Sequence, residues 1–506
     1  MKQVYNPYLP LNEYIPDGEP HVFGDRVYIY GSHDREGGET FCELDYVVYS
    51  ADVEDLTDWK CEGTIYRASQ DPHCHEIVKD AGKRKYLYAP DVVQGTDGRY
   101  YLYYALSAYA GKGGFDGPIS VAVCDTPAGK YEYYGDVRYP DGKLMLDYIP
   151  FDPGLLNDDG RIYLYYGWAL PMRPTKNRVI QKIYRKVMRR MFPKKTEEEI
   201  YSTNPGIMGG NVVELEQDML TVKSFPKRMI PCEMDASGSG FENHAFFEAS
   251  SIRKIGDTYY FIYSSSANHE LCYATSKYPD HGFVYGGTII SNGDVGYKGR
   301  RDEQRLNTTG TTHGSMENIN GQWYVFYHRL SHGSDYSRQA CAELIDIKED
   351  GTIEQVEMTS CGLNGGPLKP EGIVPATKAC NLTNGKMPHI GNKKYEKPIP
   401  KVTNEGDIHY ITGISDNVWI GFKYFEFSEE PMELKISVRG NGTGKFLVYT
   451  EEQMERLMTE IEVMPEKDWK QQTAVCSIIQ GIRPLYLKYK GTGEVDLLQI
   501  EMQRKL

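Results

Sequence analysis

The stretch GDRVYIYGSHD, residues 24–34, is the first of five similar segments along the chain. In each, Gly stands beside Asp or Asn, and a strand of alternating aromatic and β-branched residues follows, which is a hairpin signal. The other four copies are DGRYYLYYALS (97–107), DGRIYLYYGWA (159–169), GDTYYFIYSSS (256–266) and NGQWYVFYHRL (320–330). A strand-like segment precedes each copy. Five repeats of one hairpin predict an all-β protein that begins with a five-bladed β-propeller; the alternative is a β-sandwich with coincidental turns.

The repeat stops in a segment rich in Pro and Gly, near residues 365–385. We therefore predict that the propeller covers residues 1–365. Short alternating strands follow and predict a β-sandwich over residues 380–506. Its aromatic residues Trp419, Tyr424 and Trp469 could stack on sugar rings, although aromatic side chains in a sandwich mostly belong to the core.

One insertion between blades differs from the strand pattern. Residues 173–200 are basic and predict an amphipathic helix, with an apolar stripe formed by Ile180, Ile183, Val187 and Met191. Two interpretations are open for it. The helix packs locally between blades, or it binds an anionic partner or a membrane surface.

Composition narrows the class of protein. The 506 residues carry a net charge of -14, with 71 acidic against 57 basic side chains, which argues against a nucleic-acid partner. The ten cysteines form no CxxC pair, so we expect reduced thiols. No stretch is long and apolar enough for a membrane span, and the first residues lack a signal-peptide pattern, so we expect a cytoplasmic protein. The sequence gives no indication of the oligomeric state.

A polar residue stands at a corresponding place near the first strand of each predicted blade: Asp17, Asp91, Asp152, Glu248 and His313. In a propeller these positions converge on the central axis. Several carboxylates in one place repel each other and shift each other's pKa, which is costly unless they bind a metal or perform acid–base chemistry. Hydrolysis of a glycosidic bond needs one carboxylic acid and one carboxylate.

At these residues the chain resembles glycoside hydrolase family 43. PDGEPHVF is similar to the ADPSAHVF-type entry to the first strand, which places the family's catalytic Asp on Asp17. FDPGLLNDDGRIYLYYG and FEASSIRKIGDTYYFIYS resemble the elements that carry an acid-modulating Asp, here Asp152, and the general acid, here Glu248. GTTHGSM resembles the last-blade element with its axial His313, and SRQACAELIDIKEDGTIEQV the strand after it, where Arg338 could reach substrate.

The resemblance implies a single displacement with inversion, in which Asp17 deprotonates water, Glu248 protonates the leaving oxygen and Asp152 orients Glu248 and raises its pKa. The family's Pro after the first Asp is replaced here by Gly18, and a Pro follows Glu19 instead. Glu19 is therefore an alternative base, but the alignment without a gap favours Asp17. Asp34, Asp91, His313 and Arg338 are predicted to bind substrate. No cofactor is required by the resemblance, although His313 could neighbour a structural calcium ion.

The predicted function is therefore an exo-acting, inverting hydrolase of plant-derived oligosaccharides, of the α-L-arabinofuranosidase or β-xylosidase type. The C-terminal part resembles a family 6 carbohydrate-binding module. One alternative is a galactan- or arabinan-cleaving member of the same family, and another is a non-catalytic, carbohydrate-binding propeller. A retaining, fructan-cleaving glycosidase would need NDPNG-like and RDP motifs, which the sequence lacks.

Overall fold

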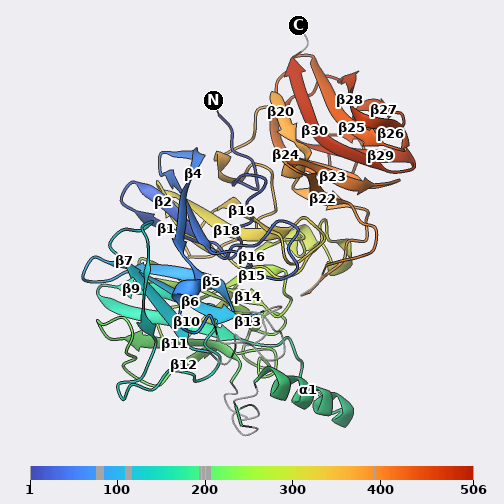
Figure 1. Cartoon of the computed structure of the whole chain (residues 1–506). Coiled ribbons are helices and arrows are strands. Elements are labelled where there is room, and N and C mark those ends of the chain that lie inside the picture. The colour runs from blue at the N-terminus through green and yellow to red at the C-terminus, as the bar shows by residue number, and fades with distance from the viewer. Residues whose placement is uncertain are drawn as a thin grey trace.

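The computed structural model describes residues 2–75, 85–108, 115, 117–192, 195–196, 200, 207–391 and 394–504. These residues form five small antiparallel sheets and, after them, two larger sheets (Figure 1). The small sheets are the blades of a propeller, and the larger ones face each other in a β-sandwich. The predicted all-β fold class is confirmed.

Each of the first four blades has four strands hydrogen-bonded in chain order. They are β1 (Glu19–Phe23), β2 (Arg26–Tyr30), β3 (Tyr46–Asp52) and β4 (Asp55–Tyr66); β5 (Tyr86–Gln94), β6 (Tyr100–Ser107), β7 (Ile119–Cys124) and β8 (Glu132–Asp136); β9 (Gly154–Asp158), β10 (Arg161–Trp168), β11 (Gly209–Leu215) and β12 (Lys227–Ile230); and β13 (Phe246–Ile255), β14 (Thr258–Ser265), β15 (Glu270–Ser276) and β16 (Val284–Ser291). The fifth blade contains β17 (Ser315–Ile319), β18 (Gln322–Leu330) and β19 (Arg338–Ile345).

The first strands of the five blades surround the axis. β1 contacts β5 and β17, β9 contacts β5 and β13, and β13 contacts β17, so the ring is closed. Polar bonds join neighbouring blades across this ring. Gly18 forms a parallel bridge with Gly314, and the hydroxyls of Ser251 and Ser315 lie 2.6 Å apart.

The many tyrosines of the hairpin repeats pack between blades. Both faces of a blade are covered by its neighbours, so successive side chains of β6, β10 and β14 are buried on opposite faces. The phenol hydroxyls reach backbone carbonyls at the rim: Tyr103 donates to Met219, Tyr165 to Pro279 and Tyr263 to His244, at 2.6 to 2.8 Å. Tyr suits this place because it fills apolar space and still satisfies its polar tip.

The N-terminal segment closes the ring at the fifth blade. Val4, Tyr8 and Ile15 belong to the same apolar cluster as Phe326 of β18. The side-chain amide of Asn6 donates to the carbonyl of Ala342 at 2.7 Å and accepts from the backbone N–H of Ala342 at 3.0 Å. This side chain therefore takes the place of a peptide group beside β19, whose edge would otherwise be open.

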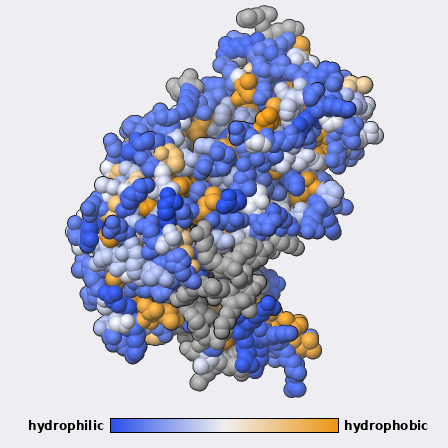
Figure 2. All heavy atoms as spheres, in the orientation of Figure 1, coloured by the Kyte–Doolittle hydropathy of each residue, from blue (hydrophilic) through white to orange (hydrophobic). Residues whose placement is uncertain are grey.

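Within the predicted insertion lies one helix, α1 (Arg178–Met191), capped by Asn177, whose side chain accepts from the backbone N–H groups of residues 179 and 180. The helix carries the predicted apolar stripe, but the stripe is not the buried face: Ile183 is 54% exposed and Val187 is 38% exposed, whereas Met188 is buried. Figure 2 shows an apolar patch at the position of α1. Packing of Met188 and Phe192 into the propeller decides which face is buried. Among the described residues no helix has the length and apolar character of a membrane span.

The sandwich follows the propeller in the chain and lies at the opposite end of the molecule from α1 (Figure 1). One sheet contains β20 (Gly372–Pro375), β22 (Lys401–Glu405), β23 (Ile408–Ile414), β25 (Met432–Gly440), β28 (Glu466–Val475) and β30 (Val495–Arg504). The other contains β21 (Asn381–Thr383), β24 (Trp419–Phe427), β26 (Thr443–Tyr449), β27 (Leu457–Val463) and β29 (Gly481–Thr492). Lys423 joins the sandwich to the propeller through ion pairs with Asp294 and Glu357.

Candidate active site

A cavity of about 400 Å³ lies at one end of the propeller axis, and all five blades contribute to its lining at or near the start of their first strands. These contributions are Asp17, Tyr88, Asp152, Glu248 and His313. The three acids predicted to be catalytic therefore meet in one cavity, although 231 positions separate the first from the last in the sequence (248 minus 17). Their roles in a reaction stay a prediction at this point.

Asp17 is an ionised carboxylate that contacts two side chains of the fifth blade, the guanidinium of Arg338 and the imidazole of His328. Arg338 donates from Nη1 to Oδ1 at 2.8 Å and to Oδ2 at 3.2 Å, and His328 Nδ1 lies 3.3 Å from Oδ1. Burial alone would raise the pKa of Asp17. The charge of Arg338, the hydrogen bond with His328 and the nearby His313 outweigh it, so this pKa lies well below its usual range.

Arg338 is fixed by Asp34 from its other side. Its Nε and Nη2 donate to the two carboxylate oxygens of Asp34 at 2.8 and 2.9 Å, and the backbone N–H of Cys42 donates to Asp34 at 2.9 Å. Such a forked ion pair fixes the guanidinium plane. Asp34 was predicted to bind substrate, but it lies behind Arg338 and outside the cavity lining, because both of its oxygens are turned to the guanidinium.

Glu248 and Asp152 line the same cavity as this charged pair and favour the neutral form. Burial, and then the charge of Asp17, raise the pKa of Glu248 to about 8. Burial, Glu248 and Asp17 raise the pKa of Asp152 well above its usual range. The backbone N–H of Ala249 donates to Asp152 Oδ2 at 3.1 Å and ties the loop before β9 to β13. At neutral pH this pair therefore retains a proton while Asp17 is charged.

His313 lies between Asp17 and Asp152. Its Nδ1 is 3.6 Å from Asp152 Oδ2 and 3.9 Å from Asp17 Oδ1, and burial lowers the pKa of the ring to about 4. The ring is therefore neutral at pH 7. Calcium prefers six to eight oxygen ligands. The carboxylates nearest His313 are Asp17 and Asp152, and both oxygens of Asp17 already accept from Arg338; the calcium ion beside His313 stays a prediction.

Asp91 and Glu19 are buried on the axis but do not line the cavity. Asp91 was predicted to bind substrate. In the structure a β-bulge in β5 precedes it, and its Oδ2 accepts from the backbone N–H of Leu155 in β9 at 2.6 Å. Glu19 accepts from Arg253 and Ser251. Of the two candidate bases, therefore, Asp17 reaches the cavity and Glu19 does not.

The sequence analysis did not identify His328 or the aromatic wall. His328 is fully buried; its Nε2 lies 2.9 Å from the carbonyl of Thr311, and its Nδ1 lies 3.3 Å from Asp17 Oδ1. The wall consists of Phe41, Tyr88, Phe115, Phe151, Trp168 and Phe247. A signal for part of it was present, because an aromatic residue directly precedes both Asp152 and Glu248 in the sequence.

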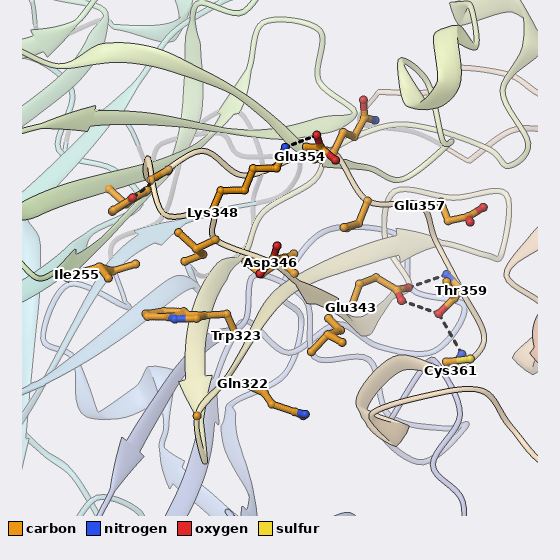
Figure 3. Close-up of a pocket in the computed structure, with 18 of the residues that line it drawn as sticks. Ile255, Gln322, Trp323, Glu343, Asp346, Lys348, Glu354, Glu357, Thr359 and Cys361 are labelled. Atoms are coloured by element: carbon orange, nitrogen blue, oxygen red, sulfur yellow. Dashed lines mark hydrogen bonds and ion pairs between the residues drawn. The ribbon is translucent and has the colours of Figure 1, made fainter.

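A larger cavity, of about 1140 Å³, lies elsewhere, between the fifth blade and the sandwich (Figure 3). Trp323, Asp346, Lys348 and Glu357 line it. It includes none of the residues predicted for the active site. The chemistry of the side chains, rather than the size of the cavity, therefore identifies the smaller cavity as the candidate active site.

Comparison with known proteins gives consistent results. The model of the glycosyl hydrolases family 43 matches residues 11–214. A xylosidase/arabinosidase of Thermoclostridium stercorarium is 45% identical over 509 residues, which is 98% of each chain. A xylosidase/arabinosidase of Bacteroides ovatus is 30% identical over 365 residues, which is 69% of this chain and 97% of that protein.

Solved structures share the propeller fold. One is a family 43 enzyme of Xanthomonas citri complexed with xylose, with a TM-score of 0.51 and 24% identity over 70% of this chain and 94% of that one. Another is a β-xylosidase/α-arabinofuranosidase from a compost microbial metagenome, in a calcium-free form with xylotriose. Its TM-score is 0.51, with 24% identity over 71% of this chain and 98% of that one.

Proposed function

The chain belongs to family 43 of the glycosyl hydrolases, and from this premise we propose that the axial cavity removes terminal α-L-arabinofuranosyl or β-D-xylosyl units from plant-derived oligosaccharides, with inversion. One observation carries the proposal. An ionised acid, Asp17, shares a cavity with a protonated acid, Glu248, and their environments separate their pKa values. Two carboxyl groups in opposite protonation states are what glycoside hydrolysis requires.

In the proposed mechanism, Asp17 removes a proton from the attacking water and Glu248 gives its proton to the leaving oxygen. Arg338 keeps Asp17 ionised, and the neutral His313 lies beside both sets of acids without adding charge. The aromatic wall excludes bulk water, so the charge of Asp17 acts on Glu248 at low dielectric. Besides burial, the largest effect that keeps Glu248 protonated comes from Asp17. The family resemblance assigns that effect to Asp152.

The size of the cavity supports action on chain ends. At about 400 Å³ it lies near the lower end of the ~300–1,000 Å³ that ligand sites span, which fits a short glycosyl unit better than an internal stretch of polymer. The names of the Thermoclostridium and Bacteroides relatives support xylosyl and arabinosyl units. Release of internal fragments from a long polymer, with no monosaccharide, would contradict this part of the proposal.

The test compares wild type, Glu248→Gln and Asp17→Asn on aryl glycosides of α-L-arabinofuranose, β-D-xylose, β-D-galactose and α-L-arabinopyranose. A dinitrophenyl leaving group needs little protonation, whereas a sugar leaving group needs it. We expect Glu248→Gln to lose ~10²–10⁴-fold on oligosaccharides and far less on dinitrophenyl glycosides. Asp17→Asn should lose activity on both, because the water is no longer deprotonated.

Stereochemistry is measured separately by proton NMR of the first product formed from a β-xyloside. The α-anomer is expected, and first release of the β-anomer would exclude inversion. Binding of oligosaccharide by wild type without any turnover would support the alternative of a non-catalytic, carbohydrate-binding propeller.

For the sandwich we propose a structural role rather than the sugar binding that its resemblance to a family 6 module implies. Tyr424 donates to Glu357 of the propeller, Trp419 packs edge-on against Tyr486, and Arg439 covers the ring of Trp469 at 4.5 Å. All three candidate aromatic side chains therefore have protein partners. Gel electrophoresis in xylan or arabinan tests this: retardation of wild type that Trp469→Ala removes would show that the sandwich binds sugar.

A further inference from the structure

Deeper on the propeller axis, a second group of titratable side chains has no role in the proposed reaction. Glu19 and His21 are two residues apart on β1 and so point to the same side of the strand, and Asp91 projects from β5. One donor atom of each, a carboxylate oxygen or an imidazole nitrogen, lies within 4.8 Å of the others. None of the three lines the cavity that holds Asp17 and Glu248.

Two of these residues are almost fully buried: Glu19 is 1% exposed and Asp91 is 0% exposed. The imidazole Nε2 of His21 lies 2.6 Å from Asp91 Oδ1, and 16% of the His21 side chain remains exposed. The group is therefore closed on most sides but keeps a contact with solvent through His21, by which a small ion could enter.

One oxygen of this group has no partner. Glu19 Oε2 accepts from Ser251 at 3.2 Å and from Arg253 at 3.3 Å, but Glu19 Oε1 is buried without any hydrogen bond. An unsatisfied buried carboxylate oxygen is costly and points to a missing cation, proton or water.

The charges of the surrounding residues are also unbalanced. Glu317 lies 3.4 Å from Arg253 Nε, so two carboxylates, Glu19 and Glu317, share the single guanidinium of Arg253. A cation bound beside Glu19 would restore the balance.

We propose that Glu19, His21 and Asp91 bind one divalent first-row metal ion, with Zn²⁺ or Mn²⁺ as the fitting chemistry. One imidazole and two carboxylates are a mixed nitrogen and oxygen donor set; it suits these ions better than Ca²⁺ or Mg²⁺, which prefer oxygen ligands throughout. Ligation requires a neutral His21. Its Nε2, which lies against Asp91 in the structure, then donates its lone pair to the metal.

The ion acts as a structural link between blades. β1 provides two ligands and β5 the third, and Asp91 Oδ2 also accepts the backbone N–H of Leu155 at the start of β9. Binding therefore ties the first three blades together at the axis. The site shares no residue with the acids and His313 of the cavity, so metal binding does not depend on the proposed reaction.

The test measures metal binding without substrate. Protein is stripped with EDTA, and ZnCl₂ or MnCl₂ is titrated in by calorimetry, with metal content measured by mass spectrometry after dialysis and Tm measured in parallel. We expect one ion per chain and an upward shift of Tm, because a ligand that binds only the folded state stabilises it. Glu19→Gln and His21→Gln should lose both effects while circular dichroism shows them folded.

Two control variants distinguish this site from others. Glu317→Gln removes a carboxylate that also contacts Arg253 but is not in the three-donor group, and His313→Ala removes the imidazole of the cavity; both should retain the ion. The proposal is overturned if stripped wild type binds neither metal, if Glu19→Gln binds as wild type does, or if only His313→Ala loses binding. Because no turnover is measured, failure of the proposed hydrolase function would leave this result intact.

Discussion

Arg338 decides the charge state of the carboxyl groups around it. It is buried, it contacts Asp17 and Asp34 at once, and its charge reaches Asp17 at 2.8 Å. Arg338 lowers the pKa of Asp17, whereas burial and the charge of Asp17 raise the pKa of Glu248. Environment, rather than residue type, therefore separates the protonation states of the two acids.

If Glu248 is the general acid, as proposed, the basic limb of the pH profile should belong to it. A general acid works only when protonated, so kcat/KM of wild type on an oligosaccharide should fall as the pH rises through about 8. On the acidic side activity should persist far below pH 5, because the base Asp17 protonates only well below its usual pKa. Initial rates across the pH range check both limbs. A basic limb that persists unchanged in Glu248→Gln would assign it to another group.

If Asp17 is the base, as proposed, the acidic limb should belong to it and depend on Arg338. Arg338→Lys keeps a positive charge but cannot donate to Asp17 and Asp34 at the same time. The pKa of Asp17 should rise, and the acidic limb of kcat/KM should move up by roughly 1 pH unit or more, since an adjacent Arg lowers an Asp pKa by about 1–3 units. Arg253→Lys, on the axis but outside the cavity, is the control. An acidic limb that stays in place would contradict this assignment of the base.

At the scale of elements, unusual backbone at the strand starts aims the acids into the cavity. Asp17 has a φ of 58°, Asp152 of 47° and Ala249, directly after Glu248, of 70°. Non-glycine residues with such left-handed backbone cost ~1–3 kcal/mol each and persist only where surrounding contacts impose them. Here the contacts are the ion pair of Asp17 with Arg338 and the hydrogen bond from Ala249 to Asp152.

Helix α1 supports the aromatic wall of the cavity from outside. Met188 is 1% exposed and belongs to the same cluster as Phe192 and Trp168, and Met191 lines the cavity itself. Met188→Ala removes buried atoms at a typical cost of ~2–5 kcal/mol, which loosens the helix where it meets the wall. We expect KM to rise several-fold with little change in kcat.

The matched control for the helix is Ile183→Ala, one turn away and 54% exposed, which should leave both constants unchanged. If both substitutions changed KM and kcat equally, α1 would act only through its helical propensity and not through packing on the wall.

At the scale of the whole molecule, the sandwich is attached to the propeller by a buried charge cluster. Lys423 is 1% exposed and lies 2.7 Å from Glu357 and 3.4 Å from Asp294, and Asn381 also donates to Asp294. Arg300 adds a pair with Glu452 at the same interface. These bonds join the sandwich to the segments that follow the fourth and fifth blades.

Lys423→Met leaves two carboxylates without their cation and should lower the free energy of unfolding by about 3–5 kcal/mol. Activity at 25 °C should be retained, because Lys423 is not among the residues that line the catalytic cavity. Denaturant unfolding with parallel assays measures both. Lys435→Met removes the partly exposed pair with Glu501 and should cost less than about 1 kcal/mol. Equal losses in the two variants would argue against a buried electrostatic joint.

Much of this architecture could be predicted because it is encoded locally. A turn of Gly with Asp or Asn and a period-two strand are properties of neighbouring residues, so five copies predicted five blades without any knowledge of contacts. The acids Asp17, Asp152 and Glu248 stand at fixed offsets from these strands, so their convergence in one cavity followed from the fold. The same reasoning gave the apolar stripe of α1 but not its buried face, which contacts with the propeller set.

The sequence by itself thus determined the blades, the sandwich and the place where three acids meet, because these depend on periodicity and spacing. Only the tertiary structure decided that Asp17 rather than Glu19 faces the cavity, that Asp34 serves Arg338, and that Asp91 turns away to hold β9. Those outcomes depend on segments that are distant in the chain and meet only after folding. Burial and the charges encountered there, which no local pattern contains, set the direction and the pKa of each side chain.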